Sequence, residues 1–365
     1  MKLAGFDLHR YELPLSEPLA LRGMVLRRRE GLLLELTGVG GAVGWGETSP
    51  LPGFSRENLD EAAGQLHGLA SSMVGREITD DRVDPDGSFG REMDAMDLAP
   101  SVRFGLELAL WNLYAAYQGK SLPELMTPYP KTTVPVNALI SGPPERALEE
   151  ARQARSAGYE AVKLKVGGRA VEEDVELVRA LNEEQCDGAV ALRLDANRAW
   201  SLEEAERFAR GTANLRLEYV EEPLADPSRL SSLASDYGVP VALDESLAGM
   251  EPEALEDRRY ARAVVLKPTL LGGISRTLRF AEYASRLGMQ TVISSAYETG
   301  VGTAALVALA SGVGDGEVPA GLDTYRRLAG DVLHPPLGLP APRADVFAMA
   351  GARREIDRRL LRPVG

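Results

Sequence analysis

The sequence predicts a closed α/β barrel joined to a smaller α+β domain. Its 365 residues accommodate a barrel of roughly 200 to 250 residues together with a companion domain. From about residue 134 onward, short β-branched apolar runs alternate with amphipathic helical stretches, which is typical of successive βαβ units. Seven or eight such units favour a closed barrel over an open doubly wound sheet, which remains the alternative.

The barrel strands follow from these apolar runs. Seven are expected at 134–140, 161–166, 191–195, 217–221, 239–244, 263–267 and 290–295, with a weaker eighth at 318–322. Helix boundaries lie between them, since Ser201 and Glu204 form a capping box and Gly158 is placed as a C-cap glycine. The order of elements therefore predicts a parallel sheet with helices between its strands.

The first hundred residues have a different organisation. Residues 31–37 and 42–47 predict an antiparallel hairpin around the glycine-rich segment 38–41. Helices are expected near 57–72 and 102–119. An antiparallel hairpin followed by helices predicts an α+β domain.

The domain boundaries are placed from these patterns. Residues 1–102 are expected to form the α+β domain and residues 103–324 the barrel. The proline-rich tail is expected to fold back, so that 325–365 joins the first domain. The acidic stretch 80–97, interrupted by proline and glycine, is predicted to be a surface loop.

Composition and charge exclude several classes of protein. Asp and Glu outnumber Lys and Arg by 54 to 41, a formal net charge of -13, so we expect no nucleic-acid or membrane partner. The single cysteine, Cys186, has no partner for a disulfide or a zinc site. The apolar stretch 301–313 is too short to span a bilayer and predicts a buried helix. With no recognisable secretion signal, a cytoplasmic location is expected.

Three carboxylates fall at the ends of successive predicted strands. Asp195 ends the third, Glu221 the fourth and Asp244 the fifth. Barrel active sites lie at the carboxyl ends of the strands, and successive strands are neighbours, so the three side chains should converge. Carboxylate oxygens are the hard ligands that Mg²⁺ prefers, and the ordered set predicts a magnesium site.

Three lysines accompany the carboxylates. Lys163 and Lys165 lie two apart on one predicted strand, so their side chains point to the same side. An isolated pair would be interpreted as solvated, but barrel strands are buried on both faces, where unpaired lysines are costly. Lys267 ends the sixth strand and should lie on the opposite flank of the carboxylates.

This constellation suits removal of a proton next to a substrate carboxylate. The carbon acid is very weak, and a metal ion can neutralise the enediolate that forms, as a Lewis acid. A lysine acts as a base only when it is deprotonated, and crowding by a second cation lowers its pKa. Lys163 would supply that crowding to Lys165.

Other motifs are absent or weak. The segment Gly300 to Ala305 resembles a dinucleotide-binding fingerprint, but about sixty residues remain after it, too few for that fold. We expect instead a helix N-terminus able to hold a substrate carboxylate. His9, His67 and His334 lie away from the predicted strand ends, and no serine-hydrolase, Walker A or zinc-protease motif is present.

Longer motifs resemble one family, the o-succinylbenzoate synthases of the muconate-lactonizing branch of the enolase superfamily. The resemblance covers most of the chain. It is carried by Gly44 to Ser55 (GWGETSPLPGFS), Lys163 to Lys165 (KLK), Leu192 to Trp200 (LRLDANRAW), Val220 to Pro223 (VEEP), Leu243 to Ser246 (LDES) and Gly321 to Thr324 (GLDT). The Lys, Asp, Glu, Asp, Lys series belongs to the whole branch, and the longer runs are closer to the synthases.

The resemblance implies a (β/α)7β modified TIM barrel with a capping domain, Mg²⁺, and a small-molecule carboxylate substrate. By it, Lys165 would remove the α proton and help the hydroxyl leave, and Lys267 would stabilise the enediolate. Lys163 and Arg193 would support them. The first glutamate of the pair, Glu221, would be the ligand and Glu222 would not. Substrate contacts would come from Ser294, Ser295, Gly321, Leu322, Asp323 and Thr324, and residues 19–29 would close over the site.

The implied reaction is the syn-dehydration of 2-succinyl-6-hydroxy-2,4-cyclohexadiene-1-carboxylate to o-succinylbenzoate in menaquinone biosynthesis. An N-succinylamino-acid racemase or a dipeptide epimerase would use the same five residues and remains the alternative. A barrel used only for binding would tolerate loss of a site residue, and none of the five is lost.

Overall fold

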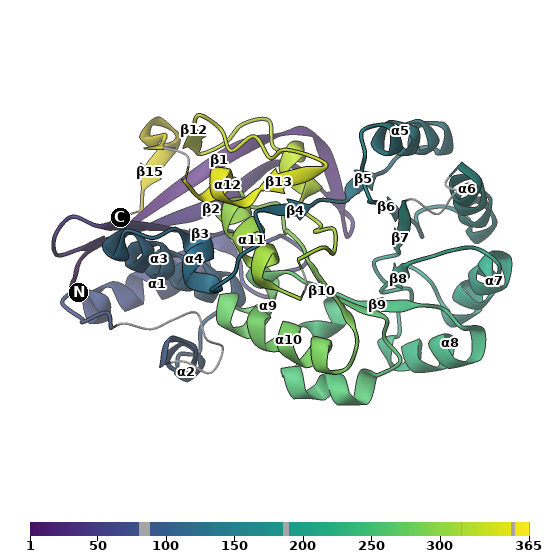
Figure 1. The fold of residues 1–365 in the computed structure, drawn as a ribbon, viewed down its shortest axis with the longest axis horizontal. Coiled ribbons are helices and arrows are strands. Elements are labelled where there is room, and N and C mark those ends of the chain that lie inside the picture. Colours follow the sequence, from purple (N-terminus) through teal and green to yellow (C-terminus); the bar gives the residue numbers. More distant parts are fainter. Residues whose placement is uncertain (80–87, 185–189, 315, 352–354, 365) are drawn as a thin grey trace.

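The structure is a computed structural model that describes residues 1–79, 88–184, 190–314, 316–351 and 355–364. The molecule has two parts (Figure 1). An antiparallel sheet and its helices form one part, and a parallel α/β barrel forms the other. Cys186 and part of the predicted 80–97 loop lie outside the described residues.

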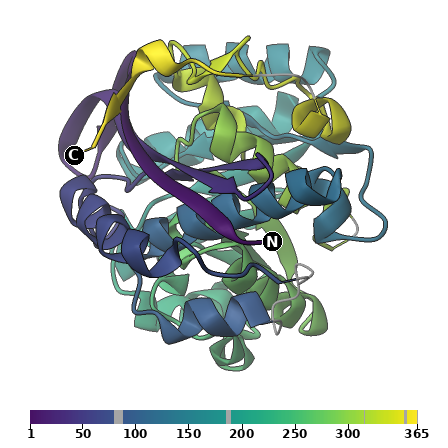
Figure 2. The ribbon, with the colours of Figure 1, turned by 90° about the vertical axis from the view of Figure 1, so that its left-hand side faces the viewer.

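The cap sheet consists of β1 (Leu3–Leu21), β2 (Met24–Gly38), β3 (Val43–Thr48) and β15 (Leu361–Pro363), in the order β15-β1-β2-β3. Arg22 and Gly23 both have positive φ, 42° and 80°, as a two-residue hairpin turn between β1 and β2 requires. The predicted hairpin is formed by β2 and β3. From the cap side, β15 (yellow) runs along the edge of this sheet (Figure 2).

Four helices accompany the cap sheet: α1 (Leu59–Met73), α2 (Ser88–Ala95), α3 (Pro100–Gln118) and α4 (Leu122–Met126). Helix α3 packs directly on β3, where Gly44 and Gly46 face it. A Cβ on Gly46 would lie 1.9 Å from the carbonyl oxygen of Gly105. Glycine is therefore required for this close approach.

The barrel sheet has the order β11-β10-β9-β8-β7-β6-β5, and all its strands are parallel. Its strands are β5 (Ala138–Ile140), β6 (Ala161–Lys165), β7 (Ala191–Asp195), β8 (Tyr219–Glu221), β9 (Val241–Leu243), β10 (Ala263–Leu266) and β11 (Gln290–Ile293). The alternating helices are α5 (Pro144–Ser156), α6 (Val171–Glu184), α7 (Leu202–Thr212), α8 (Leu230–Tyr237), α9 (Pro268–Leu271), α10 (Ile274–Arg286) and α11 (Gly300–Gly312).

Residues 320–321 close the barrel at the place of the predicted eighth strand. Ala320 bridges to Val136 and Gly321 to Ser294, both in parallel. The predicted strand 134–140 is divided into β4 (Thr133–Pro135) and β5, and β4 pairs with β13 (Arg343–Asp345). The predicted barrel is therefore confirmed, with its first strand split.

The remaining elements are short. They are β12 (Leu333–His334), α12 (Val346–Gly351), β14 (Glu355–Ile356) and 3₁₀ turns at Pro227–Arg229, Glu245–Leu247, Pro252–Arg258, Asp323–Arg327 and Arg358–Leu360. The C-terminal strand β15 pairs with β1 of the cap sheet. The domain boundaries at residues 102 and 324 stay predictions. Within the described residues, no helix is both long and apolar enough to cross a membrane.

Part of the predicted acidic loop is helical, so that prediction was wrong for α2. Asp94 of this helix accepts hydrogen bonds from Arg103 (2.6 Å) and Arg279 (2.7 Å), and Met93 is buried. These contacts come from helices α3 and α10. The local sequence does not contain these long-range contacts, and its acidic residues, proline and glycine alone are typical of a loop.

Candidate active site

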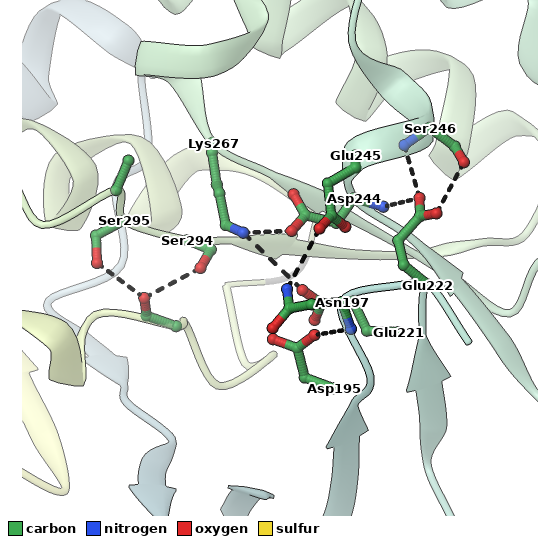
Figure 3. A network of polar contacts seen from close by, with 12 residues as sticks. Asp195, Asn197, Glu221, Glu222, Asp244, Glu245, Ser246, Lys267, Ser294 and Ser295 are labelled. Atoms are coloured by element: carbon green, nitrogen blue, oxygen red, sulfur yellow. Dashed lines mark hydrogen bonds and ion pairs between the residues drawn. The ribbon is translucent and has the colours of Figure 1, made fainter. Parts of the chain in front are cut away.

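The predicted carboxylates and lysines meet at the carboxyl ends of the barrel strands. Register places Lys165 of β6 opposite Asp195 of β7, and Asp195 opposite Glu221 of β8. Asp244 directly follows β9 and Lys267 directly follows β10. The side chains of Asp195, Glu221, Asp244 and Lys267 lie beside one another in Figure 3.

Lys163 and Lys267 lie on the two sides of Glu221. The Nζ of Lys163 lies 2.6 Å from Glu221 Oε2 and 3.0 Å from Asp195 Oδ2. Lys267 Nζ donates to Asp244 Oδ2 and lies 3.9 Å from Glu221 Oε1. Burial alone would lower the pKa of both lysines, but the carboxylates raise it above its usual value. Both are therefore ammonium ions in this arrangement.

Lys165 is the most accessible of the three lysines. Its side chain is 39% exposed, compared with 10% for Lys163 and 13% for Lys267. It donates to Asp195 Oδ2 at 2.7 Å and to the amide oxygen of Asn197. Asp195 and Asn197 thus fix the position of the Lys165 side chain, and its nitrogen remains accessible from the cavity.

The carboxylate cluster fits a divalent cation. Glu221 Oε1 is buried and accepts no hydrogen bond from the described residues. Burial and the neighbouring Asp195 carboxylate raise the pKa of Glu221 to about 8, because the negative charges lie close together away from water. Burial also raises the pKa of Asp244. A hard cation would satisfy the free oxygen and offset this repulsion.

In the part of the chain that is described, no three His, Cys, Asp or Glu residues are grouped as a ready-made metal site. Lys163 lies between Asp195 and Glu221 and contacts both. Three lysines therefore face the three carboxylates. An added dication would place further positive charge beside the lysines and would favour release of a lysine proton.

Glu222 has a different role from Glu221. Its carboxylate accepts from the backbone N–H groups of Asp244 (2.9 Å) and Ser246 (2.6 Å), and from Arg198 Nε (2.9 Å). Figure 3 shows the contacts of Glu222 with Asp244 and Ser246. Glu222 therefore positions the Asp244 loop, which supports the choice of Glu221 as the ligand.

Asn197 was missed by sequence reasoning. It has a positive φ of 44° and its amide lies between Lys165 and Glu245, donating to Glu245 Oε1 at 3.3 Å. Arg22, in the turn of the cap hairpin, donates to the same Glu245 oxygen at 3.2 Å. A polar chain thus runs from the cap to Lys165. Only its position two residues after Asp195 could have indicated Asn197.

The predicted substrate-binding residues gather where the barrel closes. Ser294 and Ser295 each donate to the carbonyl oxygen of Gly321 at 3.2 Å, and Ser295 also contacts the hydroxyl of Thr324. Both serines are buried, and Figure 3 places them across from the carboxylates beside Lys267. These contacts support a site, although the substrate roles stay predictions.

Two of the predicted substrate-binding residues differ in their access to the cavity. Leu322 is fully buried in the core. The carboxylate of Asp323 accepts from the backbone N–H of Leu139 at 3.0 Å, and burial raises its pKa. Asp323 nevertheless borders the cavity, whereas Leu322 does not.

A cavity of 60 Å³ joins these groups, bordered by Lys163, Lys165, Lys267, Asp195, Asn197, Ser294, Ser295, Gly321, Asp323 and Thr324. The cap contributes Leu21, Leu51 and Phe54 to its wall, and Tyr297 follows the serines. The volume admits only a few water molecules, but an adjoining cavity of 580 Å³ shares Phe54 and Lys267 with it and is also lined by Asp244 and Glu245.

Arg193 lies deeper in the barrel than the carboxylates. It is fully buried and contacts Glu218 (2.5 Å), Asn137 (3.3 Å) and the carbonyl oxygen of Pro319 (2.6 Å). Pro319 directly precedes the closing segment. Arg193 therefore ties β7 to the place where the barrel closes, below the site.

The N-terminus of α11 holds an anion, but the anion belongs to the protein. Glu47 of the cap accepts from the backbone N–H groups of Thr299 (2.9 Å) and Gly302 (2.9 Å) and from the hydroxyl of Tyr11 (2.7 Å). Glu47 is fully buried. The expectation that this helix end binds a substrate carboxylate was therefore wrong, because a cap residue already occupies it.

Two family models match the chain. The model described as "MenC, N-terminal domain" matches residues 3–113, and "Enolase C-terminal domain-like" matches residues 146–359. The chain is 37% identical over 324 residues to o-succinylbenzoate synthase of Vibrio cholerae serotype O1 (strain ATCC 39315 / El Tor Inaba N16961), covering 87% of this chain and 88% of that protein. It is 33% identical to the synthase of Haemophilus influenzae, covering 90% and 92%.

Solved structures share the fold. N-succinyl Arg/Lys racemase from Bacillus cereus matches with a TM-score of 0.85 and 20% identity, over 100% of both chains. Muconate lactonizing enzyme from Pseudomonas fluorescens matches with a TM-score of 0.84 and 21% identity, over 98% of both chains. At these identities the likeness establishes the architecture of barrel and cap.

Proposed function

Because this chain belongs to the o-succinylbenzoate synthase family of the enolase superfamily, we propose that it converts 2-succinyl-6-hydroxy-2,4-cyclohexadiene-1-carboxylate to o-succinylbenzoate by a magnesium-dependent syn-dehydration. The observation that carries this proposal is the placing of Lys165 and Lys267 around three carboxylates at one end of the barrel. We assign the reaction to menaquinone biosynthesis and the protein to the cytoplasm.

Lys165 acts first as the base. It takes the proton from the carbon next to the substrate carboxylate and then gives that proton to the departing hydroxyl, so that water leaves and no net proton is consumed. The exposure of its side-chain nitrogen to the cavity and its contacts with Asp195 and Asn197 support this role, in which the amine starts in its neutral form. One residue can serve both steps because both bonds break on the same face.

Lys267 acts as a fixed cation on the opposite flank. Its contacts with Asp244 and Glu221 keep it charged and aimed at the cavity, where it can stabilise the enediolate. Asp195, Glu221 and Asp244 would hold Mg²⁺, which supplies a Lewis acid for the substrate carboxylate. Ser294, Ser295 and the Gly321 to Thr324 segment are assigned to the substrate.

Racemisation or epimerisation is the second candidate. Lys165 and Lys267 both border one cavity, so each could exchange a proton on its own face of a carbon. The curated synthases at 37% and 33% identity support dehydration as the main reaction. Deuterium exchange into both enantiomers of an N-succinylamino acid would identify a racemase.

The first experiment follows loss of diene absorbance from the cyclohexadiene substrate. Wild type should consume it rapidly, EDTA should stop the reaction and added Mg²⁺ should restore it. Lys165→Ala should lower kcat by about 10² to 10⁴, the usual contribution of a general acid–base group. If wild type with Mg²⁺ leaves the substrate unchanged, the synthase assignment is wrong.

A further inference from the structure

Arg29 of β2 is a buried arginine with an unusual set of partners. Its residue is only 2% exposed, and every one of its hydrogen bonds goes to a backbone carbonyl. The acceptors are Pro50 (2.6 Å), Glu30 (3.2 Å), Ala296 (3.2 Å), Tyr297 (3.2 Å) and Ser49. Among the described residues, no carboxylate forms an ion pair with it.

These five bonds use the full capacity of the side chain. A guanidinium carries five N–H groups in a rigid fork, and here Nε makes one bond while Nη1 and Nη2 make two each. Burying a charge without a counter-ion is costly, so such a site persists only where its geometry is well satisfied. Lysine, with three donors on one nitrogen, cannot reproduce it.

Four of the five acceptors, all except Glu30, lie in or next to two walls of the substrate cavity. Ser49 and Pro50 directly precede Leu51, which borders the cavity from the cap. Ala296 and Tyr297 directly follow the two serines at the end of β11, and Tyr297 also borders the cavity. One side chain therefore joins the cap wall to the barrel wall.

The barrel wall is held in a strained conformation. Tyr297 has a φ of 64°, which costs energy for a residue other than glycine. Arg29 holds the carbonyl groups of Ala296 and Tyr297, and Glu47 holds the N–H of Thr299 just beyond them. Both contacts come from the cap. The shape of this loop thus depends on the cap being in place.

We propose that Arg29 is a positioning residue, which sets the substrate cavity by holding the Ala296–Tyr297 loop against the Ser49–Pro50 segment of the cap. It touches no substrate itself. Its effect on turnover rests on the proposed function, but its effect on the loop does not. The two can therefore be tested separately.

The test compares Arg29→Lys and Arg29→Met with a matched control, Arg179→Lys. Arg179 also donates to a carbonyl, Gly211 at 2.8 and 3.0 Å, but lies on the outer helices away from the cavity. Amide hydrogen exchange is measured without substrate at Ser295, Ala296 and Thr299, whose N–H groups are all hydrogen-bonded. Steady-state dehydration gives kcat and KM.

In Arg29→Lys, exchange at these three amides should rise at least tenfold and KM should rise by roughly tenfold to a hundredfold, with a smaller fall in kcat. Arg29→Met should do the same or more, and Arg179→Lys should match wild type in both. Unchanged exchange and unchanged KM in a folded Arg29→Lys would overturn the proposal. Failure of both Arg29 variants to fold would also overturn it, because Arg29 would then serve stability alone.

An inactive wild type would refute the synthase assignment instead. The exchange comparison would still decide whether Arg29 holds the loop.

Discussion

Glu221 and Glu222 are neighbours in sequence with opposite surroundings. Glu221 has a buried oxygen that accepts no hydrogen bond from the described part of the chain, whereas both oxygens of Glu222 accept from Asp244, Ser246 and Arg198. The alternation of side chains along a strand explains the difference, because consecutive residues point to opposite faces. The pair therefore provides the proposed metal ligand, Glu221, and a neighbouring glutamate as its control.

We expect Glu221→Gln to weaken Mg²⁺ binding at least a hundredfold, because it removes a charged ligand. Glu222→Gln should keep the affinity within about tenfold while lowering the melting temperature, since a buried partner of Arg198 is lost. Calorimetric titration with Mg²⁺ and thermal unfolding measure the two effects. The reverse order of affinities would show that Glu222 is the ligand.

Asn197 combines a left-handed backbone with a contact to Lys165. Replacing it by glycine removes the amide but relieves the backbone, whereas alanine removes the amide and keeps the strain of about 1 kcal/mol. Both variants should lower kcat by roughly tenfold or more, because Lys165 loses a partner. Only Asn197→Ala should also lose about 1 kcal/mol of unfolding free energy relative to Asn197→Gly.

Kinetics with urea unfolding separates these effects. If both variants keep the kcat of wild type, Asn197 does not orient Lys165.

Sequence reasoning located the central residues because each stands at the end of its own strand. Asp195, Glu221 and Asp244 can be aligned by strand order alone. The partners of Arg29 cannot, since Ala296 and Tyr297 are far away in sequence and contribute only carbonyl groups, which every residue has. The roles of Asn197 and Glu47 depend likewise on long-range contacts.

At the scale of elements, the contact between β3 and α3 determines how the cap packs. Gly46 allows it, because a Cβ there would lie 1.9 Å from the carbonyl oxygen of Gly105. Gly46→Ala should therefore lower the unfolding free energy by about 1 to 3 kcal/mol, the usual cost of overpacking. Gly64→Ala, in α1 with nothing within 4 Å, should instead raise it by about 0.5 to 1 kcal/mol.

Urea unfolding measures both glycine variants. Equal effects in the two would contradict the packing argument.

Helix α2 is attached through a carboxylate that responds to pH. Burial alone would raise the pKa of Asp94, but the hydrogen bonds from Arg103 and Arg279 lower it below its usual value. A lowered folded-state pKa gives stability that is present above about pH 4 and is lost as pH falls towards the folded-state pKa. Asp94→Asn should therefore be less stable than wild type at pH 7, and the difference should shrink below about pH 4.

Chemical unfolding at pH 7 and at about pH 3.5 tests this linkage. A constant difference between the two proteins would show that the charge of Asp94 does not hold α2.

Most elements could be predicted because their apolar patterns are local. The barrel strands and the β2–β3 hairpin are examples. β1 was not predicted, since Pro14 and Pro18 and several charged residues interrupt its alternation, and the pairing with β2 shifts register between Pro14 and Leu19. β2 and β15 supply the partners that make it a strand.

At the scale of the whole molecule, the cap and the barrel complete one cavity between them. Leu21, Leu51 and Phe54 come from the cap, and the lysines and serines come from the barrel. Arg22, Arg29 and Glu47 cross the same boundary with polar contacts. Closing the cap therefore builds the site as well as covering it.

The pairing of β15 with β1 has a consequence for biosynthesis. His9, Arg10 and Tyr11 leave the ribosome early, but their partners Leu361, Arg362 and Pro363 follow only after the entire barrel has been translated. The edge of β1 stays without its partner during that time, and open strand edges promote association between chains. Nascent chains halted between β11 and β15 should thus be the ones that chaperones hold longest.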